Sequence, residues 1–265
     1  MLSLSFTACR RSGNTDIALA GSTSVEPFAE RLAELYIAKL KAANPKSSLE
    51  INVQGGGSSA GVRAVQNGIC QIGMSSRSLT LDEKGLFEIP IALDGIVIIV
   101  NRANPVQGLT LEQARAIFAG RTKNWKELGG RPHSITVISR EDGSGTRASF
   151  EEKVMVGKAR EAEPVSTDAL VQDSNGAVRE IVADDPDAIG YISFGLVDER
   201  VRALALDGVA PSMPSIRLGT YPVTRKFLFL TLREPAGRVK EFIDYVLSPE
   251  GQQVLVEEGL VQVSQ

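Results

Sequence analysis

Three segments of the chain combine glycine with hydroxyl side chains in a pattern that suits the binding of a small anion. They are residues 21–24 (Gly-Ser-Thr-Ser), residues 55–61 (Gly-Gly-Gly-Ser-Ser-Ala-Gly) and residues 139–147 (Ser-Arg-Glu-Asp-Gly-Ser-Gly-Thr-Arg). Glycine lets the backbone approach a ligand closely, and hydroxyl groups are short-range hydrogen-bond donors. The third segment adds positive charge through Arg140 and Arg147. If the three segments converge, the sequence predicts an anion site built mostly from neutral dipoles.

The elements around these segments indicate how they could converge. Each segment follows an apolar stretch typical of a strand, at residues 17–20, 49–53 and 135–138, and each precedes a helical pattern. Such a loop ends at a helix N-terminus, where backbone N–H groups are unpaired and the helix dipole is positive. A single serine there is also an ordinary helix cap, so only the threefold repetition favours a site. The alternation of strand and helix predicts an α/β fold with largely parallel sheets.

The middle of the chain predicts two lobes joined by two crossings. Apolar strands are expected at residues 94–101 and 227–232, and the segment between them has strands and helices of its own. The order is typical of one domain inserted into another. The C-terminal part is expected to be helical from residue 239 to 247, with a new helix starting at Ser248, where serine caps and Pro249 occupies the first turn.

Composition excludes several classes of protein. The 265 residues are 43% hydrophobic and 23% charged, with a net charge of -3, which is ordinary globular composition and argues against a nucleic-acid surface. No stretch approaches the roughly 20 apolar residues of a membrane span. The single histidine, His133, excludes a multi-histidine metal site, and no metal or cofactor is expected.

The two cysteines have different interpretations. Cys70 follows Ile69 and is expected to be a buried thiol at a strand edge. Cys9 ends a short apolar segment and precedes a polar run, which resembles the cleavage site of a bacterial lipoprotein signal peptide, although the segment is short and lacks a basic start. Either the true start lies upstream or this is an ordinary ragged N-terminus. In the lipoprotein interpretation residues 1–8 are removed and Cys9 carries the lipid.

Taken together, these motifs resemble the short bacterial phosphate-binding proteins of the Pst-type ABC transporter. The matching segments are residues 21–25, 57–62, 72–77, 140–147, 175–177, 188–191 and 248–251. The resemblance implies a two-lobed type II periplasmic binding fold with mixed, mostly parallel sheets, flanking helices and a double hinge that closes on phosphate. It implies a first lobe of residues 16–97 and 222–265, a second lobe of residues 98–221, and a signal remnant and tether at residues 1–15. The expected partners are inorganic phosphate and the permease subunits, for a monomer at the periplasm or cell surface.

The resemblance also implies the residues of the site. Those that match the family's phosphate-binding positions are Thr23, Ser24, Ser58, Ser76, Arg140, Ser144, Gly145 and Thr146. Arg140 would grip phosphate, and Asp142 would orient it. Longer relatives carry an aspartate at the position of Ser76, which accepts the proton of hydrogen phosphate, so the basis of selectivity against sulfate is open here.

Four further residues have two interpretations each. Arg77 is a cation beside the ligand or an interlobe ion pair, and Arg147 is a site residue or a surface residue. Asp94 is a turn residue at a strand entry or a charge facing the ligand. Ser59 supports the anion site or is the nucleophile of the alternative below.

Two alternatives to phosphate binding remain. Residues 57–61 fit the G-x-S-x-G pattern of serine hydrolases, with Ser59 as nucleophile and His133 as the only available base. The prediction is nevertheless a binding protein and not an enzyme. A binding protein of the same fold for sulfate, molybdate or tungstate is the nearer alternative. A P-loop enzyme is excluded because no G-x-x-x-x-G-K-[ST] motif occurs.

Overall fold

A computed structural model describes residues 16–157 and 162–263 of the chain. Cys9 lies outside these residues, so its lipidation stays a prediction. Within the described part, no helix is both long enough and apolar enough to cross a membrane.

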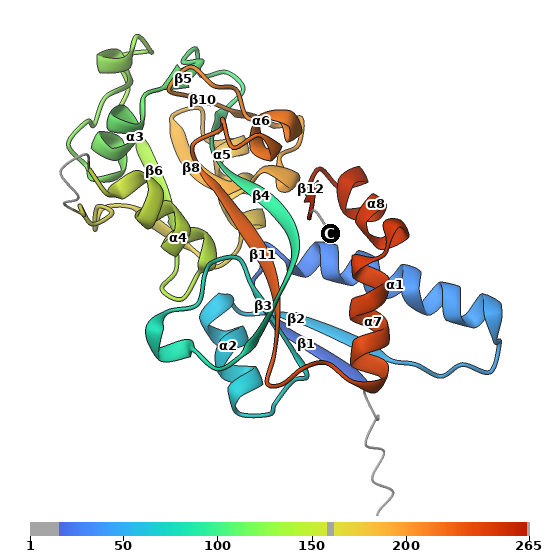
Figure 1. Cartoon of the computed structure of the whole chain (residues 1–265). Coiled ribbons are helices and arrows are strands. Elements are labelled where there is room, and N and C mark those ends of the chain that lie inside the picture. The colour runs from blue at the N-terminus through green and yellow to red at the C-terminus, as the bar shows by residue number, and fades with distance from the viewer. Residues whose placement is uncertain (1–15, 158–161, 264–265) are drawn as a thin grey trace, which may run out of the picture.

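The first half of the fold is built from three parallel strands and the helices that connect them. Strand β1 (Ile17–Gly21) pairs with β2 (Ile51–Gly55) on one side and with β3 (Ile72–Ser75) on the other. Helices α1 (Glu26–Ala43) and α2 (Ser58–Gln66) make the two crossovers. The C-terminal helices α7 (Gly237–Leu247) and α8 (Pro249–Glu257) lie beside α1 (Figure 1), where the rings of Tyr36 and Phe242 are 5.5 Å apart. As predicted, the Ser248 side chain caps α8.

The second half repeats this arrangement around β6 (Thr136–Arg140), which pairs in parallel with β7 (Leu170–Gln172) and β8 (Ala188–Ser193). Helix α4 (Gly145–Phe150) starts just after β6 and continues into one π-helical turn, Glu151–Met155. Helix α5 (Asn175–Asp184) precedes β8, and α3 (Leu111–Phe118) packs nearby. Phe150 stacks on Tyr191 with ring centroids 4.0 Å apart, which fixes the C-terminal end of α4.

The remaining elements are short. They are β5 (Gly108–Leu109), β9 (Val201–Ala203), β10 (Ala205–Leu206), β12 (Val261–Gln262), α6 (Met213–Arg217) and the 3-10 turns Leu81–Glu83, Trp125–Leu128 and Phe194–Leu196.

Two long antiparallel strands join the halves. Strand β4 (Phe87–Asn101) pairs with β11 (Thr224–Thr231) over Phe87–Gly95 and with β8 over Ile96–Val100. The sheet order is therefore β2-β1-β3-β11-β4-β8-β6-β7, parallel toward both edges and antiparallel at the centre. Figure 1 shows β11 and β4 side by side at this centre. One large core cluster draws on residues 17–92 and 227–260, and a second on residues 96–223 and 261, beside a small third cluster of Val62, Leu228 and Leu230. The two-lobed α/β fold is confirmed, and the residue boundaries of the lobes stay a prediction.

Several local boundaries differ from the sequence prediction. Helix α4 begins at Gly145 rather than near Ala148, and β2 begins at Ile51 rather than Leu49. Helix α2 ends at Gln66 because Gly68, at φ +67°, turns the chain away. Ile69 therefore falls outside the helix and is 72% exposed instead of facing the core, whereas Cys70 is a buried free thiol as predicted.

Gly61 allows α2 to approach the sheet, and this contact predicts the effect of a small substitution. A Cβ at Gly61 would lie 2.6 Å from the Ala20 carbonyl oxygen, which is backbone and cannot rotate away. We expect Gly61→Ala to lower the free energy of unfolding by about 1–3 kcal/mol, although alanine is the better helix former. Gly176→Ala is the matched control, because its Cβ would meet nothing closer than 4.0 Å. Urea unfolding of both variants checks the prediction, and an unchanged midpoint for Gly61→Ala would contradict it.

Candidate functional site

The three predicted segments converge between the two halves of the fold. Nη2 of Arg140 donates to Thr23 Oγ1 at 3.0 Å, and the backbone N–H of Ser59 donates to the Gly143 carbonyl at 3.1 Å. The N-termini of α2 and α4 lie against each other here. The start of α5 is a fourth junction that the sequence analysis did not count.

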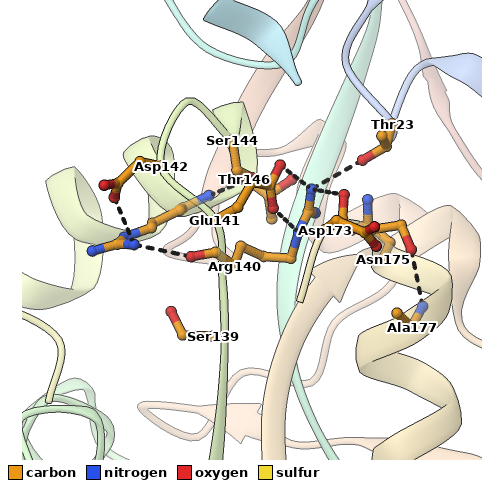
Figure 2. Close-up of polar contacts among 12 residues, drawn as sticks. Thr23, Ser139, Arg140, Glu141, Asp142, Ser144, Thr146, Asp173, Asn175 and Ala177 are labelled. Atoms are coloured by element: carbon orange, nitrogen blue, oxygen red, sulfur yellow. Dashed lines mark hydrogen bonds and ion pairs between the residues drawn. The ribbon is translucent and has the colours of Figure 1, made fainter. Parts of the chain in front are cut away.

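Arg140 is the central cation of the site. Its side chain is 1% exposed, and its Nε and Nη2 atoms donate to Glu141 at 2.8 and 3.0 Å. Nη2 also donates to the Asp173 carbonyl at 3.2 Å (Figure 2). The remaining nitrogen, Nη1, is buried and has no partner among the residues that the structure describes. A buried guanidinium N–H without an acceptor is costly, so this atom suits an anionic ligand.

The residue that orients Arg140 is Glu141, and the prediction of Asp142 was wrong. Asp142 pairs instead with Nη1 of Arg147 at 2.8 Å, and its side chain is 97% exposed (Figure 2). The cause is the turn after β6. Strand geometry ends at Arg140, so Glu141 does not alternate to the opposite face, and Gly143 at φ +88° completes a turn that leaves Asp142 outside.

Buried hydroxyl groups surround the same point. Ser22 Oγ donates to Ser76 Oγ at 2.9 Å, and the backbone N–H of Ser76 donates to Ser58 Oγ at 3.1 Å. Gly145 faces them so closely that a Cβ there would lie 2.2 Å from Ser58 Oγ and 2.5 Å from Ser76 Oγ. The backbone N–H groups of Gly145 and Thr146 belong to the first turn of α4 and have no acceptor within the helix. The structure thus gathers hydrogen-bond donors around Arg140.

A second buried arginine, Arg225, was missed by sequence reasoning. Its Nε donates to Asp94 at 2.9 Å, and the two side chains are 2% and 0% exposed. Burial raises the pKa of the Asp94 carboxyl, and Arg225 and the hydroxyl of Ser193 oppose that shift. Asp94 lies within β4 rather than at its start, so the prediction of a turn residue was wrong, whereas a charge facing the ligand stays a prediction. Asp94 is a buried partner of Arg225. Arg225 was missed because it precedes an apolar strand in the sequence, where a charged residue is expected to be exposed to solvent.

Asn175 is a further residue of the site that the prediction omitted. Its Nδ2 donates to Ser24 Oγ at 2.9 Å, while its Oδ1 accepts from the backbone N–H of Ser193 at 3.2 Å. The Ser174 side chain caps α5, so Asn175 is free for these contacts. The signal available in the sequence was an amide side chain directly after a serine that could cap a helix.

The other supporting residues have ordinary partners. Arg77 forms an ion pair with Glu83, whose pKa its hydrogen bonds lower to about 2, and it donates to Ser59 Oγ at 2.9 Å. The pair lies within the first half of the fold, so the structure does not support an interlobe ion pair of Arg77, whereas a cation beside the ligand stays a prediction. Arg147 bonds to Glu151 and to the Arg140 carbonyl. The Ser144 hydroxyl caps α4 by accepting from the Arg147 N–H at 3.3 Å.

The residues of the hydrolase alternative are not brought together. His133 pairs with Asp187 at 3.1 Å and is 53% exposed, whereas the hydroxyl of Ser59 accepts from Arg77. Ser59 therefore has no base among its partners in the described part of the chain. No cluster of three or more His, Cys, Asp or Glu side chains that could hold a metal ion occurs among the described residues.

Comparison with known proteins is consistent with this geometry. Residues 10–250 match the model of a PBP superfamily domain. The phosphate-binding protein PstS of Bacillus subtilis is 35% identical over 254 residues, which cover 94% of this chain and 81% of that protein. The PstS protein of Borreliella burgdorferi is 28% identical, with coverage of 96% and 93%.

Two solved structures are similar throughout. A putative phosphate ABC transporter substrate-binding protein with bound phosphate from Clostridium perfringens has a TM-score of 0.86 at 40% identity, covering 94% of this chain and 99% of that one. An ABC-type phosphate transport receptor from Vibrio cholerae has a TM-score of 0.75 at 37% identity, with coverage of 93% and 100%. Fold, site geometry and similarity over the whole described chain agree: the chain belongs to the PBP superfamily and, within it, to the family of the phosphate-binding proteins PstS.

Proposed function

We propose that this chain binds inorganic phosphate between its two lobes and delivers it to the permease of an ABC transporter. The observation that carries the proposal is the buried Nη1 of Arg140, which has no acceptor among the described residues, while Nη2 of the same side chain contacts the hydroxyl of Thr23. Phosphate is a tetrahedral anion with several acceptor oxygens, so it can satisfy such donors simultaneously. The names of the similar proteins, PstS and phosphate ABC transporter substrate-binding protein, support the same ligand and the same partner.

The ligand contacts are proposed residue by residue. Arg140 supplies the charge, and Thr23, Ser58, Ser76, Gly145 and Thr146 supply hydroxyl or backbone donors. Ser144 contributes by capping α4, and Glu141 keeps the guanidinium of Arg140 in place. Lobes of residues 16–97 with 222–265 and of residues 98–221 would close on the anion about β4 and β11.

The cellular setting follows from the same proposal. A PstS-type binding protein works outside the cytoplasm, at the periplasm or cell surface, where it meets the permease as a monomer. A lipid on Cys9 would tether it to the membrane. The protein would act by binding and release and catalyse no reaction, in keeping with the transport names of its relatives.

Calorimetric titration with phosphate, sulfate, molybdate and tungstate tests the ligand. We expect phosphate to bind most tightly and sulfate to bind weakly but measurably. Phosphate near neutral pH carries a proton that the Ser76 hydroxyl can accept, but the same hydroxyl can turn and donate to sulfate, so it repels sulfate less than a carboxylate would. Tighter binding of another oxyanion would replace phosphate as the ligand. Complete exclusion of sulfate would show that Ser76 does not set selectivity.

A further inference from the structure

We infer that Arg225 and Asn175 fix the direction of the hydrogen bond between Ser24 and Thr146, so that the Thr146 hydroxyl donates its proton to the bound anion. The two hydroxyl oxygens are 2.7 Å apart, and geometry alone allows either to be the donor. The inference rests on the proposed function, since it describes how the same site forms a hydrogen bond to its anion. It makes Arg225 and Asn175 positioning residues, which act on the ligand through Thr146.

The surroundings of Ser24 decide the direction. Its Oγ accepts from Asn175 Nδ2 at 2.9 Å and from Arg225 Nη2 at 3.2 Å. The orientation of the Asn175 amide is determined independently, because its oxygen accepts from the Ser193 N–H. A hydroxyl oxygen has two lone pairs and one hydrogen. With both lone pairs occupied, Ser24 cannot accept from Thr146 and must donate to it.

Counting the lone pairs of the Thr146 hydroxyl in the same way shows which group accepts its hydrogen bond. Its Oγ1 accepts from Ser24 and from Arg225 Nη1 at 2.9 Å, so both of its lone pairs are also occupied. Its own hydrogen finds no acceptor among the described residues, although the residue is only 1% exposed. Thr146 follows Gly145 in the first turn of α4, six residues after Arg140 at the end of β6. The bound anion is the acceptor for this hydrogen, and it completes the series of hydrogen bonds from Ser24 through Thr146.

Arg225 can hold this direction because it is itself immobilised. Its Nε is bound to Asp94, whose other oxygen accepts from the Ser193 hydroxyl at 2.8 Å, and Nη1 also reaches the Ser76 carbonyl at 3.3 Å. If Arg225 donated to neither hydroxyl, each oxygen would have a free lone pair and the shared hydrogen could point either way. The Arg225 guanidinium thus makes the Thr146 hydroxyl a hydrogen-bond donor to the anion. The hydrogen bond from the anion's own proton then needs a different acceptor, and the Ser76 hydroxyl is available for it.

Two single variants separate the two directions. Calorimetric titration with inorganic phosphate should show binding at least about 30-fold weaker for Thr146→Val, which removes the donor to the anion. Ser24→Ala should weaken binding by only about three- to fivefold, because Arg225 still occupies one lone pair of Thr146. Thr146→Ser restores the hydroxyl and should bind within about threefold of the parent. The reverse direction predicts the opposite order, so a Ser24→Ala defect equal to or larger than that of Thr146→Val overturns the inference.

A double-mutant cycle tests the part assigned to Arg225. Arg225→Lys keeps a cation beside Asp94 but lacks the planar fork that places one nitrogen at each hydroxyl, and we expect binding about five- to tenfold weaker. Added to Thr146→Val, it should weaken binding by less than about twofold, because it acts through the group already removed. Independent, multiplicative effects would show a general electrostatic role and overturn this assignment.

Thermal unfolding without phosphate identifies any variant that fails to fold, and the order of Thr146→Val and Ser24→Ala then decides alone. A parent that does not bind phosphate overturns the proposed function itself, which a reversed order of variants would leave intact.

Discussion

Arg140→Ala should bind phosphate at least about 30-fold more weakly than the parent. The substitution removes a buried guanidinium nitrogen that lacks an acceptor in the described part of the chain, and with it a charge-assisted hydrogen bond to the anion in a desolvated place. It also leaves the Glu141 carboxylate without its partner, which adds a negative charge facing the anion. Calorimetric titration measures the effect, and a variant within twofold of the parent would contradict the assignment of Arg140.

Two further variants separate the causes of that loss. Arg121→Ala is the control for net charge, because Arg121 is 49% exposed and forms ion pairs with Glu163 and Glu112 at the surface. We expect it to bind phosphate like the parent, since exposed charges act weakly over distance. Glu141→Gln added to Arg140→Ala should recover part of the affinity, because the unpaired carboxylate is then gone. The part not recovered belongs to the lost contact between Arg140 and the ligand.

Gly145→Ala should weaken phosphate binding by about tenfold or more, with little change in the stability of the ligand-free protein. A methyl group at this position would lie 2.2 Å from Ser58 Oγ and 2.5 Å from Ser76 Oγ, and Ser58 belongs to α2 in the opposite half of the fold. Either the two serines turn away from the ligand or the lobes stay apart. Both outcomes remove hydrogen-bond donors from the anion. When the lobes are apart, the added methyl group does not meet the two serines, so the stability of the ligand-free protein changes little.

Small-angle X-ray scattering distinguishes these outcomes. Phosphate should reduce the radius of gyration of the parent, because lobes that join through a few residues close as rigid bodies. Gly145→Ala should show a smaller reduction at saturating phosphate, and Gly176→Ala, the same substitution in open space at the start of α5, should behave like the parent. A parent whose radius does not change on binding would count against closure. An unaffected affinity for Gly145→Ala would show that the contact with Ser58 and Ser76 is not required.

The sequence was most informative where the structure is local. Each junction of strand, glycine-rich loop and helix is specified by neighbouring residues, so residues 21–24, 55–61 and 139–147 could be identified without coordinates. The choice between Glu141 and Asp142 was not local in this sense. Both carboxylates lie next to Arg140 in the sequence, and only the end of β6 and the turn at Gly143 decide which one folds back.

Residues brought together by the sheet could not be predicted from spacing. Arg225 and Asp94 are 131 positions apart and meet because β11 pairs with β4. In the sequence, Asp94 precedes a run of apolar residues and Arg225 precedes another, which is what solvated strand ends look like. The register of two antiparallel strands determines their contact, and no pattern in either strand alone reports that register.

The place of β11 in the sheet also bears on the order in which the molecule can be made. Strand β11 lies between β3 and β4, yet it consists of residues 224–231, close to the C-terminal end of the chain. A ribosome synthesises the N-terminal strands first, so β3 and β4 emerge long before the strand that separates them exists. The nascent chain therefore cannot assemble its central sheet, and it lacks Arg225, until residues 224–231 have been synthesised. Anion binding would then require a chain that extends through β11, and products truncated before this strand would lack the site.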